Sequence, residues 1–142
     1  MRRLAFLPLL LLAAPGCLMK MPVKDEVYSP CRAIDSAGWK AHVERLPATR
    51  HPKPIMKPFL IVEGTVTVPE EIDVSLALGP LEKLREPVQE VLVRTVGPAE
   101  TSGAPVSRAV RATLPLRKPV DLVRIRCGDG TLAVLRDIPT QD

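Results

Sequence analysis

The chain has 142 residues, with 20 basic and 16 acidic side chains, a net charge of +4, one Trp, one Tyr and two Phe. A chain that binds nucleic acid should show a basic stripe with aromatic or polar readers beside it. Here the charges are scattered and aromatic residues are few, so nucleic acid is excluded as an expected partner. The length suits one domain with its own core rather than two.

The first residues have the features of a secretory signal. A basic start, Met1-Arg2-Arg3, precedes an apolar run from Leu4 to Ala14, and small residues lead into Cys17. A signal core has roughly 7–15 apolar residues, whereas a bilayer span needs roughly 20. We therefore expect residues 1–16 to be a signal peptide, residues 17–30 a lipid anchor and tether, and residues 31–142 a single β-domain.

Gly16-Cys17, placed after this apolar run, resembles the lipobox of bacterial lipoproteins. In that family the cysteine thiol takes a diacylglycerol, and the cysteine becomes the first residue. The resemblance implies that Cys17 is lipidated, can be labelled with palmitate and anchors the protein to a membrane. Leu18, rather than aspartate, implies sorting to the outer membrane of a Gram-negative cell, facing the periplasm. The alternative is an ordinary secretory signal in which Cys17 is incidental.

The other two cysteines, Cys31 and Cys127, form an even pair if Cys17 is lipidated. In an oxidising compartment such a pair usually forms a disulfide, so we expect a Cys31–Cys127 bridge. Closing a loop of about 100 residues contributes about 4.7 kcal/mol in the chain-entropy model. Two buried free thiols are the alternative.

Residues 35–47 are the good helical candidate in the chain. Asp35 or Ser36 can cap a first turn, and Pro47 can end the helix. Three apolar residues share one face at i, i+4 and i+7: Trp39, Val43 and Leu46. We expect this face to rest on the sheet, with Trp39 as a lid over one edge of the core; a ligand platform at Trp39 is the alternative.

The central strand predicted for the fold is residues 59–69. Its apolar side chains point to one buried face with a glycine among them: Leu60, Val62, Gly64, Val66 and Val68. Pro69 cannot donate to a sheet ladder and ends the strand. Alternation predicts further strands at residues 72–78, 91–96, 106–114, 121–127 and 131–138, with Gly128-Asp129-Gly130 turning the chain between the last two.

Short strands with regular turn signals predict an all-β fold. We expect a small antiparallel two-sheet sandwich, immunoglobulin-like in architecture, with one short N-terminal helix; the alternative is a small closed β-barrel. The pattern of Ser36-x-x-Trp39, Gly64 to Pro69 and Val123 to Gly128 resembles small uncharacterised envelope proteins of Gram-negative bacteria. This resemblance implies no activity and no functional residues.

No catalytic residue, cofactor or metal site is predicted, so we expect no enzyme. His42 and His51 are nine residues apart, whereas zinc sites use three or four ligands at tight spacings. Glu70, Glu71 and Asp73 follow Pro69, where solvated turn charges are usual. These acids together with His42 define the enzymatic alternative, a small envelope hydrolase.

A row of arginines on the late strands is the candidate binding face: Arg108, Arg111, Arg124 and Arg126. Arg124 and Arg126 share one face, opposite Val123 and Ile125. An electropositive sheet face would meet an envelope protein or anionic lipid; the alternative is solvated residues that blunt edge pairing. The expected function is a lipid-anchored, non-catalytic binding or structural module of the envelope. A periplasmic inhibitor or chaperone that binds through a strand edge is the further alternative.

Overall fold

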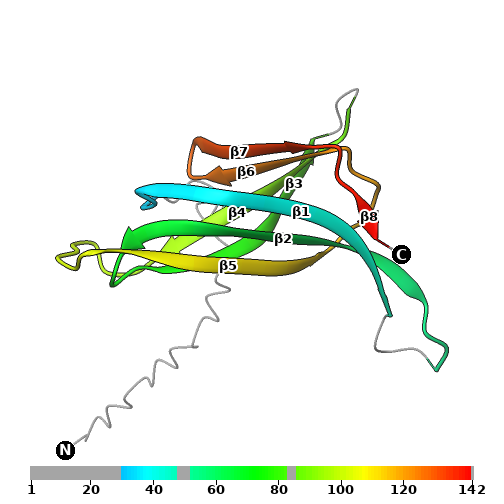
Figure 1. Ribbon diagram of the computed structural model, residues 1–142, viewed down its shortest axis with the longest axis horizontal. Helices are drawn as coiled ribbons and strands as arrows, with labels where there is room; N and C mark the ends of the chain where they lie inside the picture. The colour runs from blue at the N-terminus through cyan, green and yellow to red at the C-terminus, as the bar shows by residue number, and fades with distance from the viewer. Residues whose placement is uncertain (1–29, 48–51, 83–85, 142) are drawn as a thin grey trace, which may run out of the picture.

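A computed structural model describes residues 30–47, 52–82 and 86–141 (Figure 1). Cys17, the residues predicted to form a signal peptide and almost all of the predicted tether lie outside these residues. The described part is all-β, as predicted, with no helix. Its strands in chain order are β1 Asp35–Pro47, β2 Met56–Pro69, β3 Asp73–Glu82, β4 Val88–Val96, β5 Pro105–Pro115, β6 Leu122–Cys127, β7 Gly130–Arg136 and β8 Thr140–Gln141.

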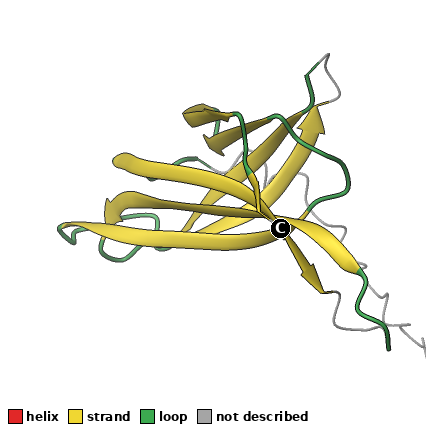
Figure 2. Cartoon of the chain, turned by 45° about the vertical axis from the view of Figure 1, so that its right-hand side comes forward, coloured by secondary structure: helices red, strands yellow, loops and turns green. Residues whose placement is uncertain are grey.

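The strands form two four-stranded sheets that pack on a shared core in a sandwich-like arrangement (Figures 1 and 2). One sheet, here sheet A, has the order β5-β2-β1-β8, and the other, sheet B, has the order β3-β4-β6-β7. Each sheet ends in strands that do not pair with the other sheet, so the alternative of a closed barrel is wrong.

The sheets are mixed, which corrects the expectation of purely antiparallel sheets. β4 pairs with β6, and β1 with β8, in parallel. The chain leaves β4, crosses to sheet A as β5 and returns to sheet B as β6. The chain reverses its direction once before β5 and once after it, so β6 runs in the same direction as β4. β5 therefore serves as the long crossover that a parallel pair requires.

β2 lies at the centre of the fold, as predicted. It pairs with β1 along one edge and with β5 along the other. Its inward side chains are fully buried: Leu60, Val62, Val66 and Val68. The opposing sheet completes the core mainly with Val91, Val93, Val123 and Ile125.

The predicted helix at residues 35–47 is wrong, because these residues form β1. β1 pairs antiparallel with β2 from Asp35 opposite Thr67 to Pro47 opposite Met56. A helix of about ten residues is marginal on its own, whereas the unpaired backbone groups along the edge of β2 offer a full ladder. Asp35 and Ser36 therefore cap no helix.

Trp39 packs against the core from a bulge in β1. The register between β1 and β2 shifts between Ala37 and Lys40, and Gly38 adopts a φ of +67° there. The indole ring lies over Gly64, where an added Cβ would come within 2.4 Å of Trp39 Cε3. The indole N–H donates to Ser36 Oγ at 3.1 Å. Gly64 thus interrupts the apolar series of β2 because the ring occupies that space.

The predicted disulfide is confirmed. Cys31 and Cys127 are bonded with a Cα–Cα distance of 5.0 Å. The residues after Cys31 also join the two sheets: the Arg32 N–H donates to Thr95 Oγ1 on β4, and the Ile34 N–H donates to the Thr67 carbonyl on β2. The start of the described chain is therefore fixed to both sheets at one end of the sandwich.

Candidate functional site

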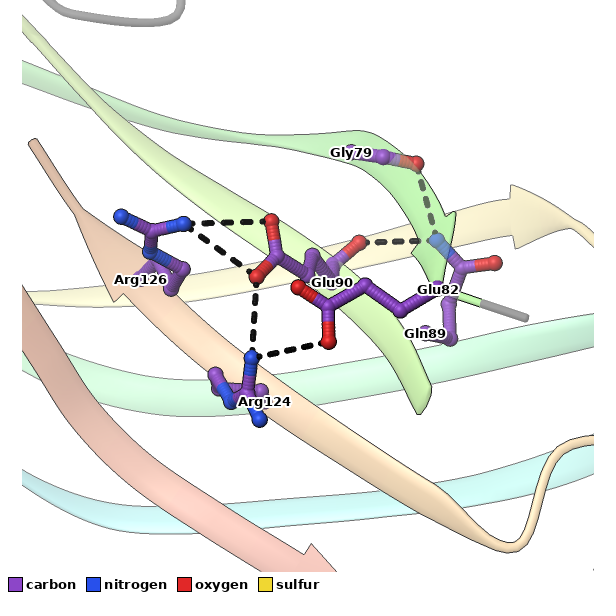
Figure 3. Close-up of polar contacts among 6 residues, drawn as sticks. All are labelled: Gly79, Glu82, Gln89, Glu90, Arg124 and Arg126. Carbon is purple, nitrogen blue, oxygen red and sulfur yellow. Dashed lines mark hydrogen bonds and ion pairs between the residues drawn. The ribbon is translucent and has the colours of Figure 1, made fainter. Parts of the chain in front are cut away.

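Arg124 and Arg126 lie on the outward face of sheet B. They alternate along β6 with Val123 and Ile125, which are fully buried. The guanidinium groups do not project freely into solvent, because the carboxylate of Glu90 on β4 lies between them (Figure 3). Arg124 Nη1 is 3.3 Å from Glu90 Oε1, and Arg126 Nη1 is 3.3 Å from the same oxygen.

A second carboxylate completes what we call the arginine cluster, namely Glu82, Glu90, Arg124 and Arg126. Glu82 Oε2 lies 3.2 Å from Arg124 Nη1. Two arginines thus meet two glutamates, and the formal charge of the cluster is zero. The candidate binding face is therefore not electropositive at Arg124 and Arg126.

Glu90 is the best-covered member of the cluster. Its side chain is 2% exposed, whereas those of Arg124 and Arg126 are 30% and 27% exposed. A Cβ added to Gly79 on the neighbouring β3 would lie 3.1 Å from Glu90 Cβ, so the glycine allows the two strands to approach closely. A buried carboxylate needs charged or hydrogen-bonding partners, and the two arginines supply them.

Backbone register produces this arrangement. In the parallel pair of β4 and β6, Glu90 lies opposite Arg124, and Leu92 lies opposite Arg126. Gln89, the residue before Glu90, is also buried, and its Nε2 donates to the Gly79 and Glu90 carbonyls at 2.9 Å each (Figure 3). The cluster thus occupies the middle of sheet B, where β4 is paired on both sides.

The four predicted arginines do not form one face. Arg111 lies on the outward side of sheet A, 3.5 Å from Glu63 on β2. Arg108 lies on the opposite side of β5 from Arg111, and its Nη2 donates to the Glu70 carbonyl at 2.6 Å. Each arginine remains a candidate contact by itself: Arg124 and Arg126 lie on sheet B, and Arg108 and Arg111 lie on opposite sides of β5 in sheet A.

Glu71 holds the connector between β4 and β5. Its Oε1 accepts the Ser102 N–H at 3.0 Å and the Gly103 N–H at 2.7 Å. The pKa of the Glu71 carboxyl lies below its ordinary value, first because its own backbone N–H stabilises the charged form and then because of the Ser102 N–H. Glu71 therefore has a structural role, in which it fixes the connector between β4 and β5.

His42 lies far from the acids that were proposed with it for hydrolysis. His42 is opposite Ile61 on β2, whereas Glu70 follows Pro69 at the end of that strand. Ile61 and Pro69 are eight residues apart, which is about 26 Å along the strand. The His42 imidazole is instead 4.0 Å from Glu44, because residues two apart in a strand share a face. His51 lies outside the described residues.

The open hollow that His42 lines does not include the acids after Pro69. This hollow of about 600 Å³ between β1 and β7 is lined by His42 with Lys40, Glu63 and Arg136 among others. In residues 30–47, 52–82 and 86–141, no group of three or more His, Cys, Asp or Glu side chains could hold a metal ion. The same residues contain no helix long and apolar enough to cross a membrane.

The edge strands differ in how they are protected against pairing with another chain. β8 has only two residues. β3 and β5 carry prolines, charges or a register irregularity: Pro80, Pro105, Arg108, Arg111 and Pro115. β7 has neither charge nor proline from Thr131 to Leu135. Arg108 and Arg111 thus lie on an edge strand that charges can blunt, whereas Arg124 and Arg126 lie on an interior strand.

Comparison with known proteins finds no matching family model, no matching curated protein and no matching solved structure.

Glu90 and Glu82 are the residues that the sequence analysis missed. Glu90 stands two residues before Leu92 on the outward face of β4, so alternation could have placed it outward together with Arg94. Its partners on β6 depend on a parallel pairing across a crossover through the other sheet. Local sequence carries no signal for that pairing.

Proposed function

We propose that this protein is a lipid-anchored, non-catalytic binding or structural module of the bacterial cell envelope, attached to the outer membrane and facing the periplasm. In this proposal residues 1–16 are a signal peptide and Cys17 carries the lipid. The domain is a small sandwich of immunoglobulin-like architecture. Its two sheets share one core, which favours a rigid scaffold over a hinged enzyme cleft.

The pairing of Cys31 with Cys127 carries the proposal. The chain has three cysteines, and the disulfide uses two of them, so Cys17 is the remaining thiol. Cys17 follows Gly16 directly after an apolar run, where a lipoprotein would have its acylated cysteine. A disulfide that fixes the start of the domain also fits an oxidising compartment such as the periplasm.

A non-catalytic role is favoured over hydrolysis by the separation of the ionisable groups. His42 lies opposite Ile61 within β2, whereas the acids follow the end of β2 at Pro69, and Glu71 accepts hydrogen bonds from the connector before β5. A general acid and a general base must both reach one substrate atom. His42 is too far from these acids to share a substrate atom with them.

The test is acylation of Cys17. Cells that express the full chain should incorporate radioactive palmitate into it, and Cys17→Ser should abolish the label and release the protein from the membrane fraction. The matched control is the double variant Cys31→Ser with Cys127→Ser, which removes the other two thiols and should keep the label. If the wild type takes no label and fractionates as soluble, the proposal is wrong.

A further inference from the structure

The ends of β1 and β2 project beyond the rest of sheet A (Figures 1 and 2). Arg45, Leu46 and Pro47 pair with Pro58, Lys57 and Met56 respectively. The neighbouring strands end before this point, because the last β5 residue, Pro115, lies opposite Phe59, and the last described β8 residue, Gln141, lies opposite Glu44. We call Arg45–Pro47 and Pro52–Pro58 the basic ribbon.

The basic ribbon exposes apolar side chains. Ile55 is 49% exposed and Met56 is 51% exposed, and both belong to the small set of large hydrophobic residues exposed on the described surface. A two-stranded ribbon without a packed face is marginal in water. Two adjacent exposed apolar side chains on such a projection make it a candidate contact surface.

The charges of the ribbon have one sign. No Asp or Glu occurs in the sequence between Glu44 and Glu63, whereas Arg45, Arg50, Lys53 and Lys57 do occur there. In the sequence Lys53 and Lys57 flank Ile55 and Met56, and all four side chains are exposed. Positive charge beside half-exposed aliphatic side chains complements an anionic bilayer, where apolar groups enter the acyl boundary and lysines meet head groups.

The side-chain types favour a bilayer over a protein partner. Protein interfaces concentrate their affinity in Trp, Tyr and Arg that fill pockets. Of these three residue types the ribbon has only Arg45, and its large exposed apolar side chains are the aliphatic Ile55 and Met56. Its prolines, Pro47, Pro52, Pro54 and Pro58, fix the backbone, so little conformational freedom is lost when the ribbon settles on a surface.

We propose that the basic ribbon docks on an anionic lipid bilayer, with Ile55 and Met56 entering the interface and Lys53 and Lys57 contacting head groups. The proposal goes beyond lipid anchoring at Cys17 and does not rest on it, because the contact is made by the folded domain. A lipid chain at Cys17 and the ribbon would give the protein two separate attachments to membrane. Each lysine is expected to change the bilayer partition coefficient about fivefold.

The experiment uses a chain that begins at Val23, which keeps every described residue and the disulfide but has no Cys17. Its cosedimentation is measured with vesicles of phosphatidylglycerol mixed with phosphatidylcholine, and with vesicles of phosphatidylcholine alone. Wild type should bind the anionic vesicles and lose affinity as salt rises. Lys53→Gln with Lys57→Gln should lower the partition coefficient about 20-fold or more. Ile55→Ser with Met56→Ser should weaken the binding that persists at high salt.

The matched control is Lys40→Gln with Arg136→Gln, which removes the same charge at two exposed positions away from the ribbon. It should bind anionic vesicles to within about twofold of wild type, because screened charges at a distance add little. Hydrogen exchange on the wild-type protein is the second readout, and amides from Ile55 to Phe59 should gain protection on anionic vesicles. The proposal is overturned if wild type ignores anionic vesicles, if neutral vesicles bind equally well, or if the control loses as much affinity as the ribbon variant.

Discussion

The arginine cluster and the basic ribbon both bring cations together, yet only the cluster contains carboxylates. In the cluster, Arg124 and Arg126 close on Glu90, whose side chain is 2% exposed. In the ribbon, Lys53 and Lys57 flank exposed apolar side chains in a stretch without an acidic residue. Neighbouring cations in a sequence therefore define a binding surface only once their partners across the strands are known. By that criterion the cluster maintains the sheet, and the ribbon is the surface for contact.

The largest effect on stability is predicted for the double variant Arg124→Gln with Arg126→Gln, which tests whether the arginine cluster maintains the sheet. The change strands the buried Glu90 carboxylate, and breaking a buried ion pair costs about 3–5 kcal/mol. Because the arginines are nearly one-third exposed, we expect a loss of about 2–3 kcal/mol in the free energy of unfolding, measured by urea titration.

The control for that prediction is Glu90→Gln added to the double variant. An amide at residue 90 removes the stranded charge, so much of the lost free energy should return. A double variant as stable as wild type would show that the two arginines are only solvated residues.

A smaller effect on stability is predicted for Glu71. This exposed carboxylate accepts hydrogen bonds from N–H groups, whereas Glu90 is paired with arginines. The pKa of Glu71 is lowered from an ordinary value of 4.5, so the folded state favours the charged form. The contribution of Glu71 to stability is therefore present above that pH and is lost as pH falls through the lower folded-state pKa. Glu71→Gln should lower the melting temperature slightly at neutral pH, and the gap to wild type should close in acid. A gap that widens in acid would contradict this assignment.

Much of the fold could be predicted from the sequence, because a strand with one buried face shows alternating apolar residues. The alternation of Leu60, Val62, Val66 and Val68 located β2, and similar alternation located the strands from β3 to β7. The Cys31–Cys127 bridge could be inferred because the number of cysteines left few choices. In each case one local pattern or one chemical constraint was enough.

The errors arose where pairing between distant strands decided the outcome. The positions of Trp39, Val43 and Leu46 fit a helix. Residues Asp35–Pro47 instead form a strand, because they pair with the edge of β2 and the Trp39 ring fills the space above Gly64. The strand also places His42 and Glu44, which are two residues apart, on one face, whereas a helix would have separated them.

The outward orientation of the candidate site's arginines could be predicted from the sequence, but the neutralisation of their charge could not. Arg124 and Arg126 point outward as alternation along β6 predicts. Their neutralisation by Glu90 depends on the parallel register of β4 and β6, which no local pattern encodes. β8, with two residues, is likewise too short to leave a periodic signal.

One measurement tests the central claim most directly: the partition of two folded variants between solution and anionic vesicles. The first variant combines Glu90→Gln, Arg124→Gln and Arg126→Gln, which removes the ion pairs between Glu90 and the two arginines. The second combines Lys53→Gln and Lys57→Gln on the basic ribbon. The account predicts that the first binds vesicles to within about threefold of wild type and that the second loses about 20-fold or more. A first variant that loses its affinity while the second retains it would contradict the account.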